Sequence, residues 1–447
     1  MEVQELLKLY AAHPQVTALD TLLKNDTSRN IFLKGLNGSG PAMTIASLFT
    51  KGRGSYVCVL NDQEEAGYFY HDLMQLTASN EVYFFPSAYR RAIKYGHVDP
   101  ANEILRTEVL SRLQDPDASF VIVTYPDALA ERVVAREVLK ENTLKISVGE
   151  KLDNMFVSDV LDEYGFEQVD YVYEPGQYAL RGSILDVFSF SYEFPYRIDF
   201  FGDEVETIRT FDVETQLSKE KLDSIYIVPE MSKNAKDSTS LLGSLPRNTF
   251  IAARDLAWCK ERIGSVWNDD PVVADEESFA DIDQMRKKLV RGEDFLREVL
   301  DFRRIHFGAR PMGTADATIH FSTQTQPIYH KNFDRVSESF HKYLDEGYTL
   351  YILSDQEKQA NRIRMIFEDR GDNIPFTAVN PTIHEGFADD TLRICFFTDH
   401  QLFDRFHKFN LKSDKARSGK ITLSLKELNQ FSQGDYIVHI DHGVGQF

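Results

Sequence analysis

Short apolar runs in the first 130 residues alternate with longer segments of helical composition, and this rhythm constrains the fold more than any other feature. The runs are NIFLKG, GSYVCVL, EVYFF and SFVIVTY, and one of the intervening segments is DQEEAGYFYHDLMQL. Strands that alternate with helices in this way form parallel α/β sheets. The sequence therefore predicts a parallel α/β domain at the start of the chain.

A glycine-rich turn follows the first of these runs. Gly35, Gly38 and Gly40 have the spacing of a phosphate-binding loop, in which backbone N–H groups surround the phosphates. Such a loop continues with a lysine and a hydroxyl, but this chain has Pro41 and Ala42. Proline removes an ammonium and an N–H group, and alanine offers magnesium no oxygen. We expect a structural turn that has lost nucleotide binding; a working nucleotide site is the alternative.

Length, apolar content and net charge indicate a protein of several domains without a membrane span or a broad DNA-binding surface. A chain of 447 residues with 42% hydrophobic residues has room for three or four domains. Neither an 18-residue apolar run nor a signal peptide is present, so we expect a cytoplasmic protein without a membrane partner. The net charge of -20 argues against a surface that embraces DNA, because DNA binding depends on Lys and Arg at the phosphates.

The candidate metal ligands are few. Cys58, Cys259 and Cys395 lie far apart in the sequence, which favours buried thiols over a disulfide framework or a zinc cluster. His439 and His442 near the end lack further ligands, so we assign them to a β turn. No metal site is expected.

Paired strands with tight turns replace the α/β rhythm between residues 144 and 213. The segment YRIDFFGDEVETI reads as a hairpin whose two-residue turn is Gly202 and Asp203. Side chains alternate along the strand YRIDFF. One face therefore carries Tyr196, Ile198 and Phe200, and the other carries Arg197, Asp199 and Phe201.

The second of these faces is a candidate interface if the first packs on the core. It presents a guanidinium group, a carboxylate and an aromatic ring, and arginine and aromatic residues are common interface anchors. The alternative is that Arg197 only pairs with Asp199 or a neighbouring strand and that Phe201 fills a core.

The remaining segments are less specific. Residues 275–305 have helix-forming composition with charges three and four apart, which predicts long, partly exposed helices. A second α/β rhythm follows in YTLYILSD, EKQANRIRMIFEDRG and LRICFFTD. Residues 404–420 carry six Lys or Arg against two Asp; we interpret them as a linker, with a DNA contact as the alternative. The final GDYIVHIDHGVGQF reads as the opening of a further β domain.

The stretch YEPGQYALRGSILDVFSFSYEFPYRIDFFGDEVETIRTFDVETQ resembles a segment shared by the excision-repair protein UvrB and the transcription-repair coupling factors, the Mfd family. Three features favour the Mfd family. Pro41 and Ala42 match its degenerate nucleotide loop. Only PSAYRRAIKYGHVDP occupies the place of the long aromatic hairpin of UvrB. The final GDYIVHIDHGVGQF resembles the start of its RNA-polymerase-interacting domain.

The resemblance implies a fold of several modules. These are a UvrB-like, RecA-like α/β domain with a degenerate phosphate-binding loop, an inserted α+β domain, a small α/β domain, and the start of an SH3-like β-barrel. The implied boundaries are domain 1a at 1–130, domain 2 at 131–229, domain 1b at 230–331, domain 3 at 332–409, a linker at 410–432, and the polymerase-interacting domain from 433 to 447.

The resemblance also implies a function. The chain would be the UvrA-recruiting, non-ATPase part of a factor that displaces stalled RNA polymerase and brings excision repair to DNA damage. Arg181, Arg197 and Phe201 match the UvrA-binding positions, although Arg181 could instead pair with Asp186 or Glu174. Two other functions stay open: a UvrB-like ATP-dependent excision-repair protein, and an interaction scaffold without a repair role.

The same resemblance assigns the remaining partners and cofactors. No cofactor is expected in this chain, whereas ATP and Mg are expected in a motor beyond residue 447, which would also make most of the DNA contacts. RNA polymerase would bind the domain that begins near residue 433. An intramolecular contact with the C-terminal half would cover the UvrA-binding surface until the motor engages.

Overall fold

The computed structural model describes residues 2–25, 28–79, 81–89, 99–115, 117–229, 238–269, 286–405, 407, 436–439 and 443–446. The chain divides into two compact units. The first comprises Met1–Lys140 and Ser232–Leu411, and the second comprises Glu141–Met231 and Lys412–Phe447. The chain therefore leaves the first unit after Lys140, forms most of the second unit, and returns to the first unit at Ser232.

A seven-stranded sheet, entirely parallel, forms the centre of the first unit, in the order β17-β1-β16-β15-β2-β4-β3. This confirms the parallel α/β sheet predicted from the apolar runs. The returning part of the chain supplies three of its strands, and β15 and β16 lie between β1 and β2. The strands are β1 (Asn30–Lys34), β2 (Tyr56–Val59), β3 (Val82–Phe85), β4 (Val121–Thr124), β15 (Phe250–Ala253), β16 (Arg303–His306) and β17 (Ala317–His320).

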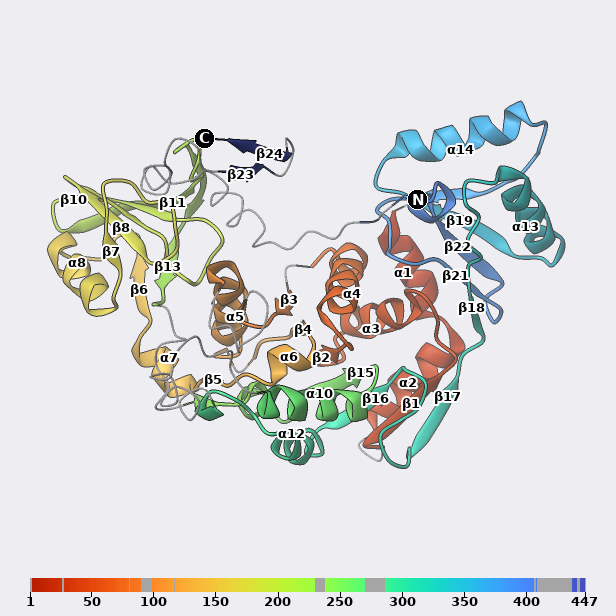
Figure 1. Cartoon of the computed structure of the whole chain (residues 1–447), viewed down its shortest axis with the longest axis horizontal. Coiled ribbons are helices and arrows are strands. Elements are labelled where there is room, and N and C mark those ends of the chain that lie inside the picture. The colour runs from red at the N-terminus through yellow and green to blue at the C-terminus, as the bar shows by residue number, and fades with distance from the viewer. Residues whose placement is uncertain are drawn as a thin grey trace. The chain divides into compact units, whose positions relative to one another are not determined.

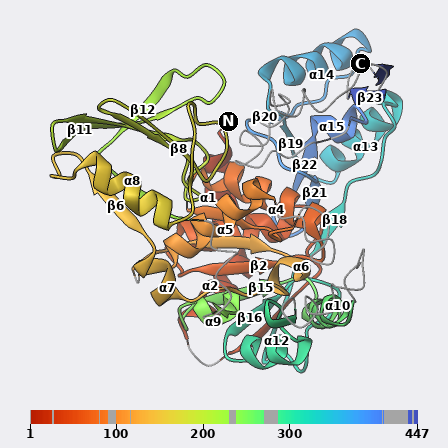
Figure 2. The same ribbon diagram turned by 60° about the vertical axis from the view of Figure 1, so that its left-hand side comes forward.

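Helices cover both faces of this sheet. Helices α1, α3 and α4 lie on one face, and α10 and α12 lie on the other (Figures 1 and 2). Asp62 and Asp255 cap α4 and α10 by accepting hydrogen bonds from backbone N–H groups of the first turn. The helices are α1 (Val3–Ala11), α2 (Pro14–Lys24), α3 (Gly40–Thr50), α4 (Gln63–Thr77), α5 (Pro100–Arg112), α6 (Pro126–Leu129), α7 (Arg136–Glu141), α9 (Leu241–Ser244), α10 (Leu256–Asn268) and α12 (Gly292–Val299). A short pair, β5 (Val133–Val134) and β14 (Ser238–Thr239), is antiparallel.

The prediction of long helices over residues 275–305 is wrong at its end. Residues 275–285 lie outside the described residues, and α12 spans only Gly292–Val299. The following RRIH forms strand β16, in which Ile305 and His306 are buried in the parallel sheet. Burial between two strands decides the conformation here, although the spacing of charges in the sequence favours a helix.

A smaller mixed sheet completes the first unit, in the order β18-β21-β22-β19-β20. Its β19 and β22 are the two apolar runs of the second α/β rhythm, and they pair in parallel as that rhythm predicted. The strands are β18 (Thr323–Thr325), β19 (Thr349–Leu353), β20 (Thr377–Val379), β21 (Phe387–Asp389) and β22 (Ile394–Thr398). The accompanying helices are α13 (Phe333–Asp345), α14 (Glu357–Asp369) and α15 (Asp399–Leu402).

The second unit is built on a six-stranded sheet in the order β12-β11-β10-β9-β8-β7. All its pairings are antiparallel except that between β7 and β8, as the paired strands in the sequence predicted. Helix α8 (Asn154–Glu163) supplies Val157 and Leu161 to its core. The strands are β7 (Glu167–Gln168), β8 (Gln177–Arg181), β9 (Ile184–Val187), β10 (Tyr196–Phe201), β11 (Glu204–Phe211) and β12 (Ser218–Leu222), with a separate pair of β6 (Leu144–Ser147) and β13 (Ser224–Ile227).

Strands β23 (Tyr436–His439) and β24 (Gly443–Gln446) pair antiparallel, in agreement with the β structure predicted for the end of the chain. The assignment of His439 to a turn is wrong, because His439 is the last residue of β23 and pairs with Gly443. Most of the basic stretch at 404–420 lies outside the described residues, as do His442 and residues 90–98 of the segment PSAYRRAIKYGHVDP.

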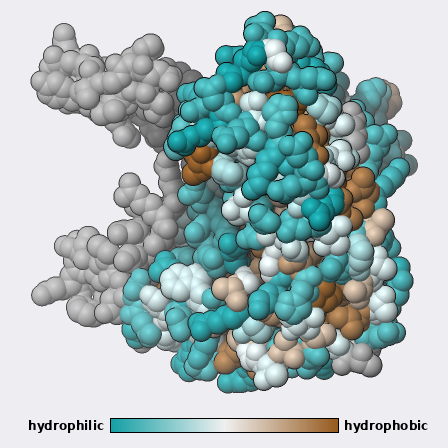
Figure 3. Space-filling view, turned by 90° about the vertical axis from the view of Figure 1, so that its right-hand side faces the viewer, coloured by the Kyte–Doolittle hydropathy of each residue, from teal (hydrophilic) through white to brown (hydrophobic). Residues whose placement is uncertain are grey.

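The structure bears on two expectations from the sequence, the lack of a membrane span and the burial of the cysteines. The face drawn in Figure 3 is largely hydrophilic, with small separate hydrophobic patches. Among the described residues, no helix combines the length and the apolar character needed to cross a membrane. Cys58, Cys259 and Cys395 are free and buried, as predicted, and burial raises the pKa of all three thiols.

Candidate functional site

The predicted interface lies on interior strands of the antiparallel sheet, with Arg197 and Phe201 on β10 and Arg181 on β8. Tyr196, Ile198 and Phe200 are buried in the core, which confirms the alternation predicted from YRIDFF. The opposite face carries Arg197, Asp199 and Phe201, of which Phe201 is 78% exposed. The alternative in which Phe201 fills a core is therefore wrong.

A tight turn holds Phe201 at the tip of the β10–β11 hairpin. Phe201 pairs with Glu204, so Gly202 and Asp203 form the two-residue turn that the sequence predicts. Gly202 has a φ of 66°, in the left-handed region that favours glycine at the first position of such a turn. A Cβ atom at Gly202 would meet nothing within 4 Å, so the turn is open to solvent.

Arg197 is held by a buried carboxylate on the neighbouring strand β9. Its Nε lies 2.7 Å from Asp186 Oδ1 and its Nη2 lies 2.8 Å from Asp186 Oδ2, a bidentate ion pair. Its guanidinium group lies 4.3 Å from the centre of the Phe211 ring. These contacts leave its side chain only 16% exposed, while the Asp186 side chain is 0% exposed. The hydrogen bonds to Asp186 raise the pKa of Arg197.

Arg181 shares the same carboxylate. It donates to Asp186 Oδ2 and to the backbone oxygen of Asp170, the latter at 2.8 Å. Its guanidinium group lies 5.0 Å from the centre of the exposed Tyr171 ring, and its side chain is 35% exposed. The pairing of Arg181 with Asp186 considered from the sequence is thus present, and Asp186 joins two of the three predicted site residues.

Asp199 has other partners than Arg197. It accepts hydrogen bonds from Arg209 and from Thr207 Oγ1, both on β11, the latter at 2.7 Å. The structure therefore brings Arg181 and Arg197 onto one carboxylate, whereas Phe201 stands at the hairpin tip on the same face of β10 as Arg197.

Sequence reasoning missed two exposed apolar residues at the start of α8. Met155 and Phe156 are exposed, and the segment before them is bonded to both hairpin turns. The Leu152 N–H donates to Asp203 O at 2.8 Å, and Asn154 Nδ2 donates to Gly182 O at 3.3 Å. Their position opposite the buried Val157 and Leu161 is the signal that could have identified them.

The glycine-rich loop between β1 and α3 is the second candidate site, and other parts of the first unit pack closely against it. Gly35 has a φ of 86°, and a Cβ atom there would overlap the backbone oxygen of Phe321. Gly38 has a φ of 53°, and a Cβ atom there would lie 2.9 Å from the backbone oxygen of Gly386. Residues far along the chain therefore occupy the space beside both glycines.

The loop's polar groups have protein partners. The N–H group of Ser39 donates to the backbone oxygen of Glu385 at 3.0 Å, and the N–H group of Glu385 donates to Ser39 Oγ at 3.0 Å. The N–H group of Asn37 donates to Thr323 Oγ1 at 2.9 Å. Nearby, burial raises the pKa of Asp72 to about 7. Two N–H groups that a phosphate-binding loop would direct at its ligand are thus used within the protein.

Pro41 and Ala42 stand where a phosphate-binding loop has a lysine and a hydroxyl residue. Pro41 and Ala42 are buried in the first turn of α3, as a proline near a helix start allows. Gly35, Gly38 and Gly40 thus form the strand-to-helix turn that the sequence predicts.

A comparison with known protein families finds a match for residues 144–232, here called the antiparallel module. Residues 144–232 match the family model of the UvrB interaction domain. This range contains Arg181, Arg197 and Phe201 and nearly coincides with the first segment of the second unit.

Two relatives with the same printed name are similar to the chain. The chain is 22% identical to the transcription-repair-coupling factor of Staphylococcus aureus (strain bovine RF122 / ET3-1), over 97% of this chain and 44% of the relative. It is 29% identical to the transcription-repair-coupling factor of Escherichia coli (strain K12), over 49% of this chain and 19% of the relative. The chain thus resembles transcription-repair-coupling factors, as its motifs predict, and spans less than half the length of the first of these relatives.

Proposed function

We propose that this chain recruits UvrA to sites of DNA damage, through the face of the antiparallel module that carries Arg181, Arg197 and Phe201. The observation that carries the proposal is the hairpin tip: Phe201 is 78% exposed within a module of the UvrB interaction class. A large ring held out by a tight turn loses little conformational freedom on binding and buries much apolar area.

The two arginines have different roles in this proposal. Arg197 is largely covered and fixed on Asp186, so it orders the strand beside Phe201 and keeps a positive charge at the face. Arg181 is more exposed and, with Tyr171, is the better candidate for a direct contact with the partner. Arginine and aromatic side chains commonly carry most of the energy of an interface.

The proposal includes no ATP hydrolysis by this chain. Pro41 and Ala42 lack the ammonium and hydroxyl groups of a nucleotide site, and Asn37 and Ser39 direct their N–H groups at protein acceptors. We assign three other activities to a longer protein, of the length of the relatives, of which this chain would be one part. These activities are ATP-driven movement on DNA, magnesium binding and displacement of RNA polymerase. The longer protein's polymerase contact would involve the domain that includes the terminal hairpin, and its C-terminal half would cover the UvrA-binding face at rest.

UvrA binding by single variants tests the proposal. We expect Phe201→Ala to weaken binding about 30-fold, which corresponds to about 2 kcal/mol. Arg181→Ala should weaken it about 10-fold. Tyr226→Ala is the matched control, because Tyr226 is 50% exposed on β13 of the same unit and should leave the affinity unchanged within about twofold. Affinity would be measured by calorimetry with purified UvrA.

Three outcomes separate the alternatives. If a folded Phe201→Ala variant bound UvrA as tightly as the wild type, UvrA would not bind through this face. If the wild-type chain did not bind UvrA at all, an interaction scaffold without a repair role would be favoured. Saturable ATP binding by the wild-type chain at micromolar nucleotide would favour a UvrB-like ATP-dependent protein.

A further inference from the structure

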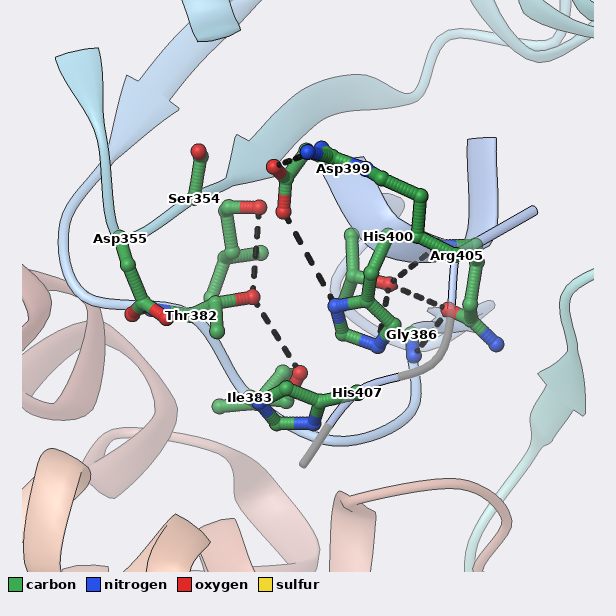
Figure 4. Close-up of polar contacts among 12 residues, drawn as sticks. Ser354, Asp355, Thr382, Ile383, Gly386, Asp399, His400, Arg405 and His407 are labelled. Carbon is green, nitrogen blue, oxygen red and sulfur yellow. Dashed lines mark hydrogen bonds and ion pairs between the residues drawn. The ribbon is translucent and has the colours of Figure 1, made fainter. Parts of the chain in front are cut away.

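Three histidines meet in the first unit, beside the loop that packs on the glycine-rich turn. His384 lies between β20 and β21, His400 lies in α15, and His407 follows that helix. One ring nitrogen from each lies within 4.8 Å of the other two. Figure 4 shows His400 and His407 next to the loop that carries Ile383 and Gly386. The three residues are separated in sequence, so the fold alone assembles this histidine cluster.

The spacing of two of these nitrogens fits a shared metal ion. His384 Nδ1 and His407 Nδ1 are 3.4 Å apart. Two imidazole nitrogens that each lie about 2.0–2.1 Å from Zn²⁺ at tetrahedral angles are separated by about 3.3 Å. The separation of the two nitrogens matches a shared ion and is also that of a hydrogen bond between them. Because the two rings are nearly parallel, at 20°, they have to rotate for both lone pairs to point at one ion.

His400 has the hydrogen bond that orients a metal ligand. Its Nε2 donates to the backbone oxygen of His384 at 2.7 Å, which leaves the lone pair on Nδ1. That Nδ1 atom is buried and has no hydrogen-bond partner among the described residues; the nearest carboxylate oxygen, Asp399 Oδ1, is 3.9 Å away. A histidine that donates one ring N–H to a backbone carbonyl and keeps the other nitrogen free is the usual arrangement at a metal.

Stacking of the rings is the competing explanation. The His384 ring lies 3.6 Å from the Tyr68 ring, and the His400 and His407 rings are 4.3 Å apart and nearly parallel. Stacking accounts for the packing of the rings but gives the buried Nδ1 of His400 no partner, and a buried polar atom without a partner is costly. A metal ion would satisfy this nitrogen.

The chemistry of the neighbouring groups selects the kind of ion. Asp399 Oδ2 is paired with Arg405 at 2.6 Å, and the ligand atoms that lie within 4.8 Å of one another are imidazole nitrogens. Nitrogen donors favour Zn²⁺ and similar transition metals over Mg²⁺ and Ca²⁺. A fourth imidazole, His71 on α4, lies 5.2 Å from the His407 ring.

We propose that His384, His400 and His407 bind one Zn²⁺ ion or a similar transition-metal ion. The ion fastens His407, which follows the last helix of the mixed sheet, to the loop that begins at His384. The next residues of that loop, Glu385 and Gly386, contact the glycine-rich turn. Metal binding therefore also stabilises the packing that closes this turn, and the site is independent of the UvrA-binding face.

Cobalt and zinc titrations of the tag-free, chelator-treated chain test the proposal. Co²⁺ should produce the visible absorption of a tetrahedral site at one ion per chain, and Zn²⁺ should displace it. In competition with a chromophoric chelator, His407→Ala should weaken Zn²⁺ binding by more than about 10-fold, since loss of even an outer partner of a ligand costs 10- to 100-fold. His341→Ala, on the exposed face of α13, is the matched control and should bind as the wild type does.

Folding has to be separated from binding in this experiment. His407 follows the last helix of the unit and is partly exposed, so its variant should keep the circular dichroism spectrum and the unfolding temperature of the metal-free wild type. Zn²⁺ should raise the unfolding temperature of the wild type and of His341→Ala but not that of His407→Ala. Equal Zn²⁺ affinity of wild type and His407→Ala, or no binding by the wild type at micromolar Zn²⁺, would overturn the proposal.

Discussion

Two turns in this chain each contain a glycine with positive φ, but one turn is packed against other residues and the other is open. Gly38 in the glycine-rich loop and Gly202 in the β10–β11 hairpin both have positive φ, at 53° and 66°. A Cβ atom on Gly38 would lie 2.9 Å from a backbone oxygen, whereas one on Gly202 would meet nothing within 4 Å. The turn with the familiar binding motif is closed by protein, and the turn without one holds an exposed phenylalanine. A motif thus describes a backbone shape, and the packing around it decides whether a partner can reach it.

The largest effect is expected where the closed turn is tightest. Gly35→Ala adds a Cβ atom that overlaps the backbone oxygen of Phe321 at a φ of 86°. We expect the free energy of unfolding to fall by more than about 3 kcal/mol. Gly52→Ala is the matched control, since Gly52 has a φ of 70° but open space around it, and should cost only about 1 kcal/mol. Denaturant titration measures both; equal losses would mean that the loop is not closed.

The next largest effect concerns the support of the open turn. Arg197→Ala removes the bidentate partner of the buried Asp186 and leaves it only Arg181. We expect a loss of about 2–3 kcal/mol in the stability of the second unit. Arg247→Ala breaks a pair between two exposed side chains, Arg247 and Asp301, and should cost less than about 0.5 kcal/mol. If Arg197→Ala lowered the unfolding free energy as little as this control does, Arg197 would not stabilise the fold, and its only role in the proposal would be contact with UvrA.

A pH-dependent effect is expected from a buried histidine on β16, the strand that pairs with β1. His306 on β16 lies 2.7 Å from Asn30 Oδ1 on β1, and burial, with a smaller effect of Arg304, lowers its pKa to about 4. In the unfolded chain the pKa is about 6.5, so between these values the unfolded state binds more protons. Stability present above pH 6.5 is therefore lost as the pH falls towards 4.

The variant His306→Asn isolates this contribution. The difference in unfolding free energy between wild type and variant should shift by about 1–2 kcal/mol in favour of the variant when the pH is lowered from 7.5 to 5. Urea titrations at the two pH values measure it. A difference that does not change with pH would show that His306 is not kept neutral by the fold.

The smallest effect is expected from restoring the motif. Pro41→Lys with Ala42→Thr recreates the lysine and hydroxyl of a phosphate-binding loop. We expect no saturable ATP binding at micromolar nucleotide, because Ser39 and Asn37 donate their N–H groups to Glu385 and Thr323. Equilibrium binding of a fluorescent ATP analogue checks this. Tight binding by the double variant would mean that two side chains alone separate the loop from a working site.

Local patterns in the sequence predicted much of this architecture. The four apolar runs predicted parallel strands, and the alternation in YRIDFF correctly separated Tyr196 and Ile198 from Arg197 and Phe201. These features depend on residues close in sequence, whose side-chain period is visible directly.

Features formed by distant segments could not be predicted in this way. Nothing in the loop at residues 35–40 indicates that residues 385–386 pack on it, and the three histidines of the cluster have no motif spacing in the sequence. The charges of Arg303 and Arg304 suggested a helix, whereas the partners of β16 on both sides made it a strand. In each case the deciding contacts come from strands or loops far along the chain.

The placement of β15 and β16 between β1 and β2 has a consequence for synthesis of the protein. The parallel sheet lacks its middle strands until the ribosome has made residues up to His306, whereas the antiparallel sheet of β7 to β12 needs only residues up to Leu222. Because domains fold as units when their segments emerge, the hairpin-rich module can acquire its structure while the first half of the parallel sheet still waits for its middle strands. A pause in translation after Leu222 has emerged would thus leave a folded antiparallel sheet attached to an unfinished α/β domain on the ribosome.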